Sequence, residues 1–333
     1  MKLSLSRKSL ISSALLLSLL FIILVFIVDW QIVYDQISQV NSYYLLFACG
    51  LLVIGYVIYA IRWKTLLSNQ CNLLPTFHVA NIGNMMNTLL PLRPGDAARI
   101  FLLGKKEDLP FLEVTSSIVV ERWFEQILRF AALGGAIILG VGFQVSNITI
   151  LGSIIFLAGS FIGMVWLIRN REIALSRLPK LFARLPRLTE TQIRKGLENL
   201  VDGLAGVSSI YRLFGILLIS ILTWSFFWGF HFTCLISLQQ DLSIQTFLAL
   251  SLGSLALVPP SASTLPGMYQ VSMVVPLSLF SFDKNLLTSY SLVMNFTEMV
   301  VIMGFGLWGT MQTGISSKEL SRDDATRLPA DQI

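Results

Sequence analysis

Long apolar runs, separated by short polar segments, make up most of the chain. Six of them are close to the length of about 20 residues that a helix needs to cross a bilayer. These runs cover residues 10–28, 43–61, 113–142, 148–168, 212–238 and 287–311. The first run is followed by Asp29-Trp30-Gln31 instead of a small-residue cleavage site, so we interpret it as a retained transmembrane helix and not as a signal peptide.

Two further apolar regions, 73–104 and 244–281, are interrupted near their centres. The interrupting residues include Pro91, Pro94 and Gly95 in the first region and Pro260 and Gly267 in the second. Backbone that leaves the helical conformation at membrane depth must be buried in protein or line a wet cavity. Paired interrupted segments in the two halves of a membrane protein also point to a substrate site between them. We therefore predict two broken, re-entrant helical hairpins.

The predicted fold is an all-α integral membrane protein, a polytopic bundle of about six full transmembrane helices plus two re-entrant hairpins in an inverted arrangement. Residues 1–315 would form a single transmembrane domain, followed by a polar cytoplasmic tail at 316–333. Composition agrees, because only 13% of the residues are charged and 54% are hydrophobic. A soluble domain usually carries about 25% charged residues, so this chain has too few charges to cover a surface in water.

The distribution of charge predicts the orientation in the membrane. Most of the 24 lysine and arginine residues fall in segments assigned to one side, Arg62 and Arg99 among them. The other side carries Asp29, Asp35 and Asp283. Since basic residues favour the cytoplasmic side, we predict a multi-pass plasma (inner) membrane protein with both termini in the cytoplasm. This orientation accounts for the net charge of +5, and a nucleic-acid partner is not expected.

The longest polar segment, 169–211, has an amphipathic pattern. Apolar residues recur at helical spacing (Leu178, Leu181, Phe182, Leu185 and Leu188), and the other face is basic (Arg177, Lys180, Arg184 and Arg187). Such a segment is expected to lie on the anionic cytoplasmic leaflet. Pro179 and Pro186 argue against one straight helix, and a solvated linker is the alternative.

Charged residues inside the apolar runs are the main functional candidates, because ionisable side chains in a membrane are costly. Glu121, Arg122, Glu125 and Arg129 lie in one run and share an arc of about 100° on a helix. Glu125 is three residues after Arg122 and four before Arg129, so these side chains can pair along the helix. The alternatives are a self-neutralised structural cluster and a polar stripe that faces a hydrated interior.

The first interrupted region carries Arg93, Asp96 and Arg99 around its break. We expect Asp96 to cap a helix that starts at Ala97, which would leave both arginines free. Guanidinium groups and an exposed helix N-terminus are both suited to phosphate. The alternative is a purely structural salt bridge between Asp96 and Arg99.

The last run places Asn295 and Glu298 on one face, where Glu298 could complement an arginine, a cationic head group or a proton, or serve helix packing. His231 is predicted to be a hydrogen-bonded interior residue. The three cysteines show no disulfide or metal-site spacing, and we expect no metal, cofactor or catalytic motif.

Four short patterns carry a resemblance to a known family. They are Arg62-Trp63, the segment 90–99 (Leu-Pro-Leu-Arg-Pro-Gly-Asp-Ala-Ala-Arg), Glu121-Arg122-Trp123-Phe124-Glu125 and the segment 260–270. Together they resemble the flippase-like family typified by the transmembrane region of lysylphosphatidylglycerol synthase. The fourth pattern departs from the family, because Ser263-Thr264-Leu265 replaces its Pro-Gly-Gly and Gln270 replaces its glutamate. This departure indicates a different head group.

The resemblance implies a two-hairpin bundle that translocates lipids or assists a lipid-modifying enzyme. The expected substrate-binding residues are Arg93, Asp96, Arg99, Glu121, Arg122, Glu125, Arg129, Asn295 and Glu298. Our leading hypothesis is a lipid flippase that binds phosphate-bearing head groups of membrane lipids. A non-transporting scaffold for a lipid- or glycan-modifying enzyme and, less favoured, an intramembrane transferase are the alternatives.

Overall fold

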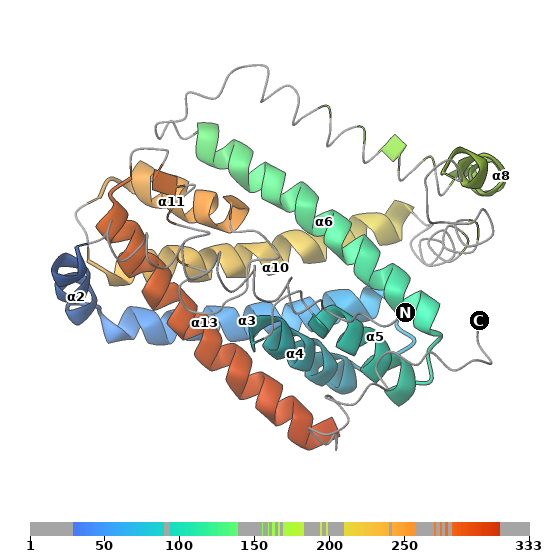
Figure 1. Ribbon diagram of the computed structural model, residues 1–333, viewed down its shortest axis with the longest axis horizontal. Coiled ribbons are helices and arrows are strands. Elements are labelled where there is room, and N and C mark those ends of the chain that lie inside the picture. The colour runs from blue at the N-terminus through green and yellow to red at the C-terminus, as the bar shows by residue number, and fades with distance from the viewer. Residues whose placement is uncertain are drawn as a thin grey trace, which may run out of the picture.

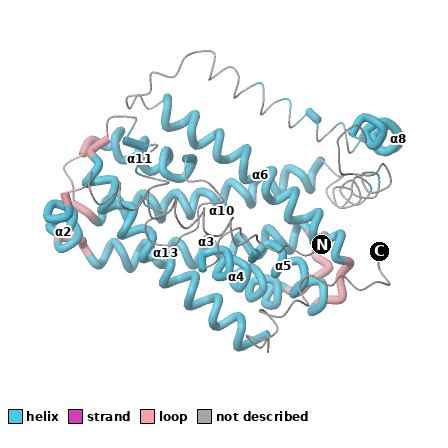
Figure 2. Tube along the Cα trace, in the orientation of Figure 1, coloured by secondary structure: helices cyan, strands magenta, loops and turns pink. Residues whose placement is uncertain are grey.

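The computed structural model describes residues 29–89, 94–138, 169–182, 210–239, 242–257 and 282–313, with isolated positions in 155–166, 194–198 and 270–278. Every element within these residues is a helix, and the described connections are short loops (Figure 2). The helices are α2 (Trp30–Ser38), α3 (Ser42–Leu66), α4 (Leu73–Leu89), α5 (Pro94–Lys106), α6 (Phe111–Ile138), α8 (Arg171–Phe182), α10 (Ile210–Ser237), α11 (Ile244–Leu257) and α13 (Lys284–Thr313).

Helices α3 and α10 form an antiparallel pair in the middle of the bundle (Figure 1). At one end the Asn41 backbone N–H donates to the Ser237 carbonyl oxygen over 2.9 Å. At the other end Arg212 Nη1 donates to Ser68 Oγ over 3.2 Å. We call the first of these ends the α2 end, because α2 lies there, and the second the opposite end.

Three helices are long and apolar enough to cross a membrane among the described residues. They are Ser42–Leu66, Phe214–Ser237 and Lys284–Thr313, with mean hydropathies of 2.3, 1.6 and 1.5. Helix α6 is also long, with 28 residues, but its charged side chains lower its apolar character. The all-helical membrane architecture predicted from the sequence is therefore confirmed. The number of spans and the inverted arrangement of the hairpins stay predictions.

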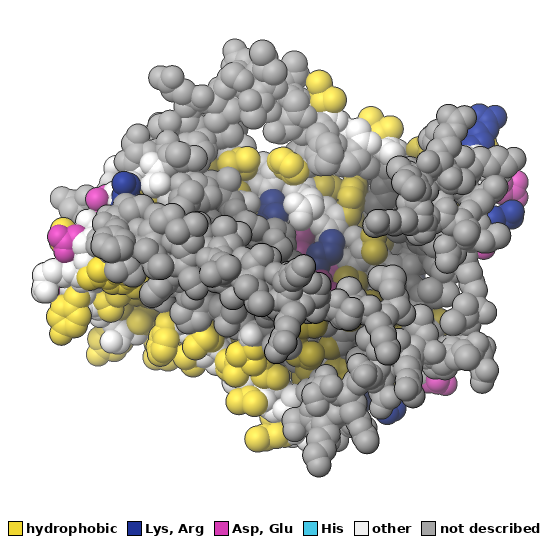
Figure 3. Space-filling model, viewed as in Figure 1, with side chains coloured by type: hydrophobic (Ala, Val, Ile, Leu, Met, Phe, Trp, Pro, Cys, Tyr) yellow, Lys and Arg dark blue, Asp and Glu magenta, His cyan; other side chains and the backbone are white. Residues whose placement is uncertain are grey.

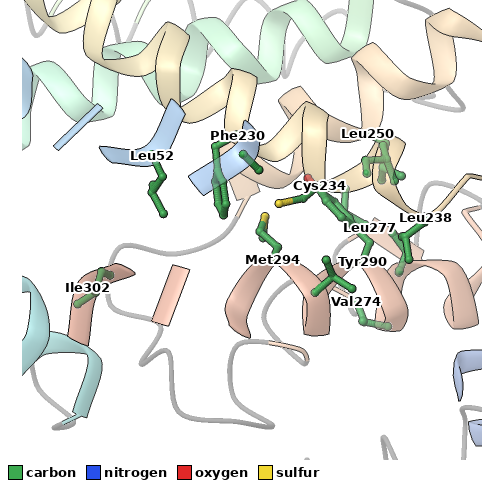
Figure 4. Close-up of a cluster of buried hydrophobic side chains, with 14 of the residues drawn as sticks. Leu52, Phe230, Cys234, Leu238, Leu250, Val274, Leu277, Tyr290, Met294 and Ile302 are labelled. Atoms are coloured by element: carbon green, nitrogen blue, oxygen red, sulfur yellow. The ribbon is translucent and has the colours of Figure 1, made fainter. Parts of the chain in front are cut away.

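The core of the α2-end half lies between α3, α10, α11 and α13 (Figure 4). Leu52, Phe230 and Tyr290 are almost fully buried there, and Cys234 and Met294 face one another across the helices. Large apolar side chains also cover the outside of the bundle, including Leu46 and Phe47 on α3. Apolar residues on both the inside and the outside are expected for a bundle in lipid.

The interrupted region 73–104 forms two helices, α4 and α5, that pack against each other. The predicted helix–break–helix layout is observed, with residues 90–93, and hence Pro91 and Arg93, outside the described residues. Both helices lie toward the opposite end of the bundle (Figure 1). Helix α11 is the first arm of the second interrupted region, and it starts at the α2 end. Pro260 and Gly267 lie outside the described residues.

The described helices add two details to the predicted limits. Helix α3 continues to Leu66, beyond the end of the predicted run at residue 61. Helix α8 includes Pro179 and ends at Phe182, and residues 183–209 lie outside the described residues apart from Arg194 and Glu198.

Candidate functional site

The site is built on the close crossing of α4 and α5. A Cβ atom on Gly95 would overlap the Gly83 carbonyl oxygen, and one on Gly83 would lie 2.7 Å from Arg99 Cδ. Both positions therefore need a glycine, which lets Arg99 pass close to the α4 backbone. Asn87 fastens the crossing, because its Oδ1 accepts from the Gly95 backbone N–H over 2.8 Å.

Arg99 projects from α5 to α6 and forms a bidentate ion pair with Glu121. Its Nη1 donates to Glu121 Oε1 over 3.0 Å, and its Nη2 donates to Oε2 over 2.8 Å. Both side chains are fully buried. Two charges taken out of water repay their desolvation only with such near-ideal geometry and additional hydrogen bonds. Tyr59 supplies one of these, since its hydroxyl donates to Glu121 Oε1 over 2.6 Å.

A second layer of charge lies beside this pair and is partly exposed. Arg122 Nη2 donates to Asp96 Oδ1 over 2.7 Å, and its Nη1 donates to Glu125 Oε2 over 2.7 Å. The exposed fractions are 24% for Arg122 and 27% for Asp96. Figure 3 shows acidic and basic side chains together near the centre of one face, among hydrophobic ones. We call the group of Arg122, Asp96 and Glu125 the exposed edge.

Helix α3 contributes Arg62, which sequence reasoning had placed in a cytoplasmic loop. Its side chain is 1% exposed, and its Nη2 lies 3.2 Å from Glu125 Oε1 and 3.8 Å from Glu121 Oε1. Its Nε and Nη1 are buried and form no hydrogen bond with any described residue. Two donor nitrogens of Arg62, which together carry three N–H groups, are therefore available within the cluster, and this favours an additional acceptor there.

Aromatic residues of α3 form the wall behind the arginines. The Arg99 Cζ lies 4.0 Å from the centroid of the Trp63 ring, and the Arg62 Cζ lies 4.9 Å from that of Tyr59. Trp63 is held in turn, since its Nε1 donates to Ser117 Oγ over 3.0 Å. Flat guanidinium groups stack well on such rings, so the wall fixes the planes of both arginines.

The predicted capping role of Asp96 is wrong. Helix α5 begins at Pro94, a residue whose fixed φ suits the first helical position, and Asp96 lies in its first turn. Asp96 pairs with Arg122, and Asn87 makes the hydrogen bond at the helix start. Arg99 is consequently not free for phosphate, because Glu121 occupies its fork. Its contact with Asp96 is a looser one of 3.9 Å.

A family model described as the lysylphosphatidylglycerol synthase transmembrane region matches residues 9–306. The chain belongs to this family. Searches of curated proteins and of solved structures find no match.

Three of the four patterns that resemble the family converge in this one cluster. Arg62-Trp63 comes from α3, Asp96 and Arg99 come from α5, and the Glu121–Glu125 stretch comes from α6. In this member of the lysylphosphatidylglycerol synthase transmembrane family, the three motifs therefore contact one another in space. Of the fourth pattern, only Gln270 is described, and its side chain is buried; residues 260–269 lie outside the described residues.

The predicted residues of α13 lie apart from this cluster. Asn295 is buried, and Glu298 accepts a hydrogen bond from the Tyr56 hydroxyl over 3.4 Å. Tyr56 and Tyr59 are one turn apart on α3. Through them, this helix contacts both Glu298 of α13 and Glu121 of the charged cluster. Sequence reasoning missed both tyrosines, although Tyr56, Tyr59 and Arg62 recur at helical spacing along α3.

Arg129 continues the polar stripe of α6 toward the α2 end. Its Nη1 lies 3.5 Å from the Ala256 carbonyl oxygen on α11, and its Cζ lies 5.7 Å from the Trp224 ring centroid. The stripe predicted from the sequence is thus observed on α6, and Arg129 brings it into contact with α10 and α11. The predicted interior role of His231 is also confirmed, because its Nδ1 lies 2.9 Å from Ser254 Oγ.

The charged cluster can bind a ligand without leaving a net buried charge. It combines three arginines (Arg62, Arg99 and Arg122) with three carboxylates (Asp96, Glu121 and Glu125). A ligand that carries both a phosphate and a cation could bind at the exposed edge, with its phosphate in place of a carboxylate and its cation in place of an arginine. Within the described helices no group of His, Cys, Asp and Glu side chains is arranged to hold a metal ion.

Proposed function

We propose that this protein translocates phosphate-bearing lipids, whose head groups bind at the exposed edge of the charged cluster. The observation that carries the proposal is the partly exposed Arg122–Asp96–Glu125 group, which rests on a buried Arg99–Glu121 pair inside a membrane bundle. Because such charges are costly in lipid, a cluster of this size points to a function. Membership of the lysylphosphatidylglycerol synthase transmembrane family supports a lipid-related one.

In this proposal the residues of the cluster have different roles. Arg122 is the head-group contact, since its guanidinium is partly exposed and can exchange Asp96 or Glu125 for a lipid phosphate. The spare N–H donors of Arg62 add to this acceptor site. Arg99 and Glu121 support the site from within. Arg93 remains an expected contributor from the sequence.

The proposal includes an orientation. The opposite end of the bundle carries exposed basic residues, among them Lys105, Lys106 and Arg212, whereas Asp29 and Asp35 are exposed at the α2 end. With the basic end in the cytoplasm, α4 and α5 re-enter the membrane from that side, and α11 enters from the other. The head group would then pass between the two interrupted regions.

Reconstituted liposomes test this function directly. Purified protein is reconstituted with fluorescent phospholipids of several head-group classes, and the loss of fluorescence on adding dithionite reports lipid that reaches the outer leaflet. We expect Arg122→Gln to slow translocation about tenfold or more, because a hydrogen bond to a charged group contributes about 1.5–3 kcal/mol. Arg122→Lys should fall in between, since lysine keeps the charge but loses the fork.

Arg194→Gln is the matched control, because Arg194 is 63% exposed and pairs with the exposed Glu198. Its rate should equal that of the wild type. If the wild type translocates no head-group class, autonomous translocation is excluded. The protein would then be an accessory subunit for a lipid-modifying enzyme, for which the exposed Arg171 and Arg177 of α8 offer a docking surface.

A further inference from the structure

Helix α6 contacts both interrupted regions of the chain, through one arginine each. Arg122 Nη2 donates to Asp96 Oδ1 on α5, the second arm of the first region, over 2.7 Å. Arg129 Nη1 lies 3.5 Å from the Ala256 carbonyl oxygen on α11, the first arm of the second region. The two arginines are two helical turns apart, which is about 10 Å along the axis of α6. Helix α6 therefore connects the two regions between which the head group is proposed to pass.

Gln126 lies between the two arginines on the same face of α6. At about 100° per residue, Arg122, Gln126 and Arg129 share an arc of about 60°. Gln126 is exposed and Arg129 is half-buried, and 24% of the Arg122 side chain is exposed. All three polar side chains thus reach the surface of the protein. We call these three residues the polar track.

The polar track lies at the depth of the membrane-crossing helices. Before Gln126 in the chain, Glu121 accepts a hydrogen bond from Tyr59 of α3, and after it Arg129 packs over the Trp224 ring of α10. Tyr59 and Trp224 both belong to helices that are long and apolar enough to cross a bilayer. An exposed amide at this depth is unfavourable against acyl chains, which offer it no hydrogen bond. The exposure of Gln126 therefore favours a polar environment along this face.

We propose that the polar track faces water within the membrane, and that Gln126 and Arg129 form a second, outer subsite for the phosphate of a lipid head group. This inference rests on the proposed function, in which Arg122 makes the first contact. Phosphate suits the pair because both side chains supply N–H donors, and a guanidinium group can bind two phosphate oxygens at once. The Arg129 Cζ lies 5.7 Å from the centroid of the Trp224 ring, which supports the guanidinium group from one side.

Two subsites about 10 Å apart divide the passage of a head group into shorter steps. The phosphate leaves Arg122 and reaches Arg129, and the Gln126 amide donates to it between the two. The phosphate is thereby never surrounded by acyl chains alone. Asp96 and Glu125 then pair with Arg122 again, so the exposed edge returns to the arrangement seen in the structure.

Spin-label accessibility in reconstituted vesicles tests whether the track faces water. In a background without the native cysteines, Gln126→Cys is compared with Ala131→Cys, an exposed position about 140° away around α6. Each label is probed with oxygen, which concentrates in lipid, and with a water-soluble nickel chelate. Gln70→Cys in an exposed loop is the water reference. We expect the chelate to reach Gln126→Cys, as it reaches the reference, and oxygen to be the more effective reagent at Ala131→Cys.

Either of two label results would overturn the proposal. A label at Gln126→Cys that oxygen reaches and the chelate does not would mean that acyl chains cover the track. A label that neither reagent reaches would mean that protein covers this face. Because Gln126 and Ala131 are both exposed, the substitutions remove no buried side chain. The labels need no transport activity, so this result is separate from the success or failure of the proposed function.

Translocation by Gln126→Leu in the liposome assay tests the outer subsite itself. We expect a rate about tenfold below that of the wild type, because leucine cannot donate a hydrogen bond to the charged phosphate. Gln126→Asn keeps the amide and should be faster than Gln126→Leu. The matched control is Ala131→Leu, which adds the same side chain to the same helix and should translocate at the wild-type rate.

The apparent melting temperature separates a subsite from a structural role. Gln126→Leu should melt like the wild type, since the replaced side chain is exposed. Equal translocation rates for Gln126→Leu and Ala131→Leu would overturn the outer subsite while leaving the proposed function intact. A wild type that moves no lipid would instead count against the proposed function, and the outer subsite would be lost with it.

Discussion

The residues of the charged cluster fall into a buried supporting pair and the exposed edge. Arg99 and Glu121 are fully buried and hold each other in a two-point contact, whereas Arg122 and Asp96 reach the surface. The two arginines Arg99 and Arg122 therefore have different roles within the same cluster. Burial separates these roles, because a buried ion cannot lose its partner without a large desolvation cost.

Removing the charge of Glu121 is expected to destabilise the fold. In Glu121→Gln, Arg99 remains buried without a charged partner, and breaking a buried pair in this way costs about 3–5 kcal/mol. The apparent melting temperature of detergent-solubilised protein, followed by fluorescence-detected size exclusion, measures the effect. Glu198→Gln breaks an exposed pair and should change little. Equal melting temperatures for the two variants would show that the buried pair contributes no stability.

The sequence predicts which residues of this site are charged but not how they pair. The sequence alone shows that Glu121, Arg122 and Glu125 are charged residues in an apolar run, where burial in lipid is unfavourable. It also shows that they share one helical face. The partner of Arg99 is 22 residues away on another helix, and no local spacing rule can identify it. Proximity in sequence suggested only Asp96 as a partner of Arg99, as the alternative to the helix cap, and that contact is a loose one of 3.9 Å.

At the scale of elements, the crossing of α4 and α5 decides where Arg99 can reach. Gly95→Ala should disrupt this crossing, because the new methyl group would overlap the Gly83 carbonyl and lie 2.7 Å from Asn87 Oδ1. We expect a clear loss of folded protein and of lipid translocation. Yield and monodispersity on size exclusion measure the first, and the liposome assay measures the second.

Gly134→Ala on α6 is the control for this prediction, since nothing lies within 4 Å of its added methyl group. It should be neutral or more stable by up to about 1 kcal/mol, the difference in helix propensity. If Gly95→Ala behaves like Gly134→Ala, the two helices do not need to cross so closely.

The limits of the helices could be predicted only in part. Apolar length placed α3, α10 and α13 close to their observed positions, and the proline-containing break at 90–95 separated α4 from α5. The sequence did not reveal that α3 extends past Arg62, because a charged residue next to an apolar run usually marks the membrane boundary. Here Arg62 has carboxylates of α6 as partners, so tertiary contacts allow the helix to continue.

At the scale of the whole molecule, charge separates the two ends and predicts an orientation. In a background without native cysteines, Ser38→Cys at the α2 end should react with an impermeant maleimide on intact cells. Gln70→Cys, near the end of α3, should react only after the membrane is permeabilised. Labelling of Gln70→Cys on intact cells, with Ser38→Cys protected, would mean that the protein has the reverse orientation.

Binding of a substrate lipid should also stabilise the whole bundle. A ligand that binds only the folded state at 100 times its dissociation constant adds about 2.7 kcal/mol. Short-chain phospholipids are therefore expected to raise the apparent melting temperature of the wild type, and this increase should be smaller for Arg122→Gln. A similar increase with an uncharged detergent of the same chain length would argue against recognition of the head group.

The equal numbers of arginines and carboxylates in the cluster also restrict how this chain can evolve. A single change of charge at any of these six residues leaves one ion without compensation, and at the buried Arg62, Arg99 and Glu121 this occurs in a low-dielectric interior. Substitutions at these positions should therefore be inherited in compensating pairs. Related chains that handle other lipids are expected to differ here by exchanged partners, with the sum of charges kept at zero.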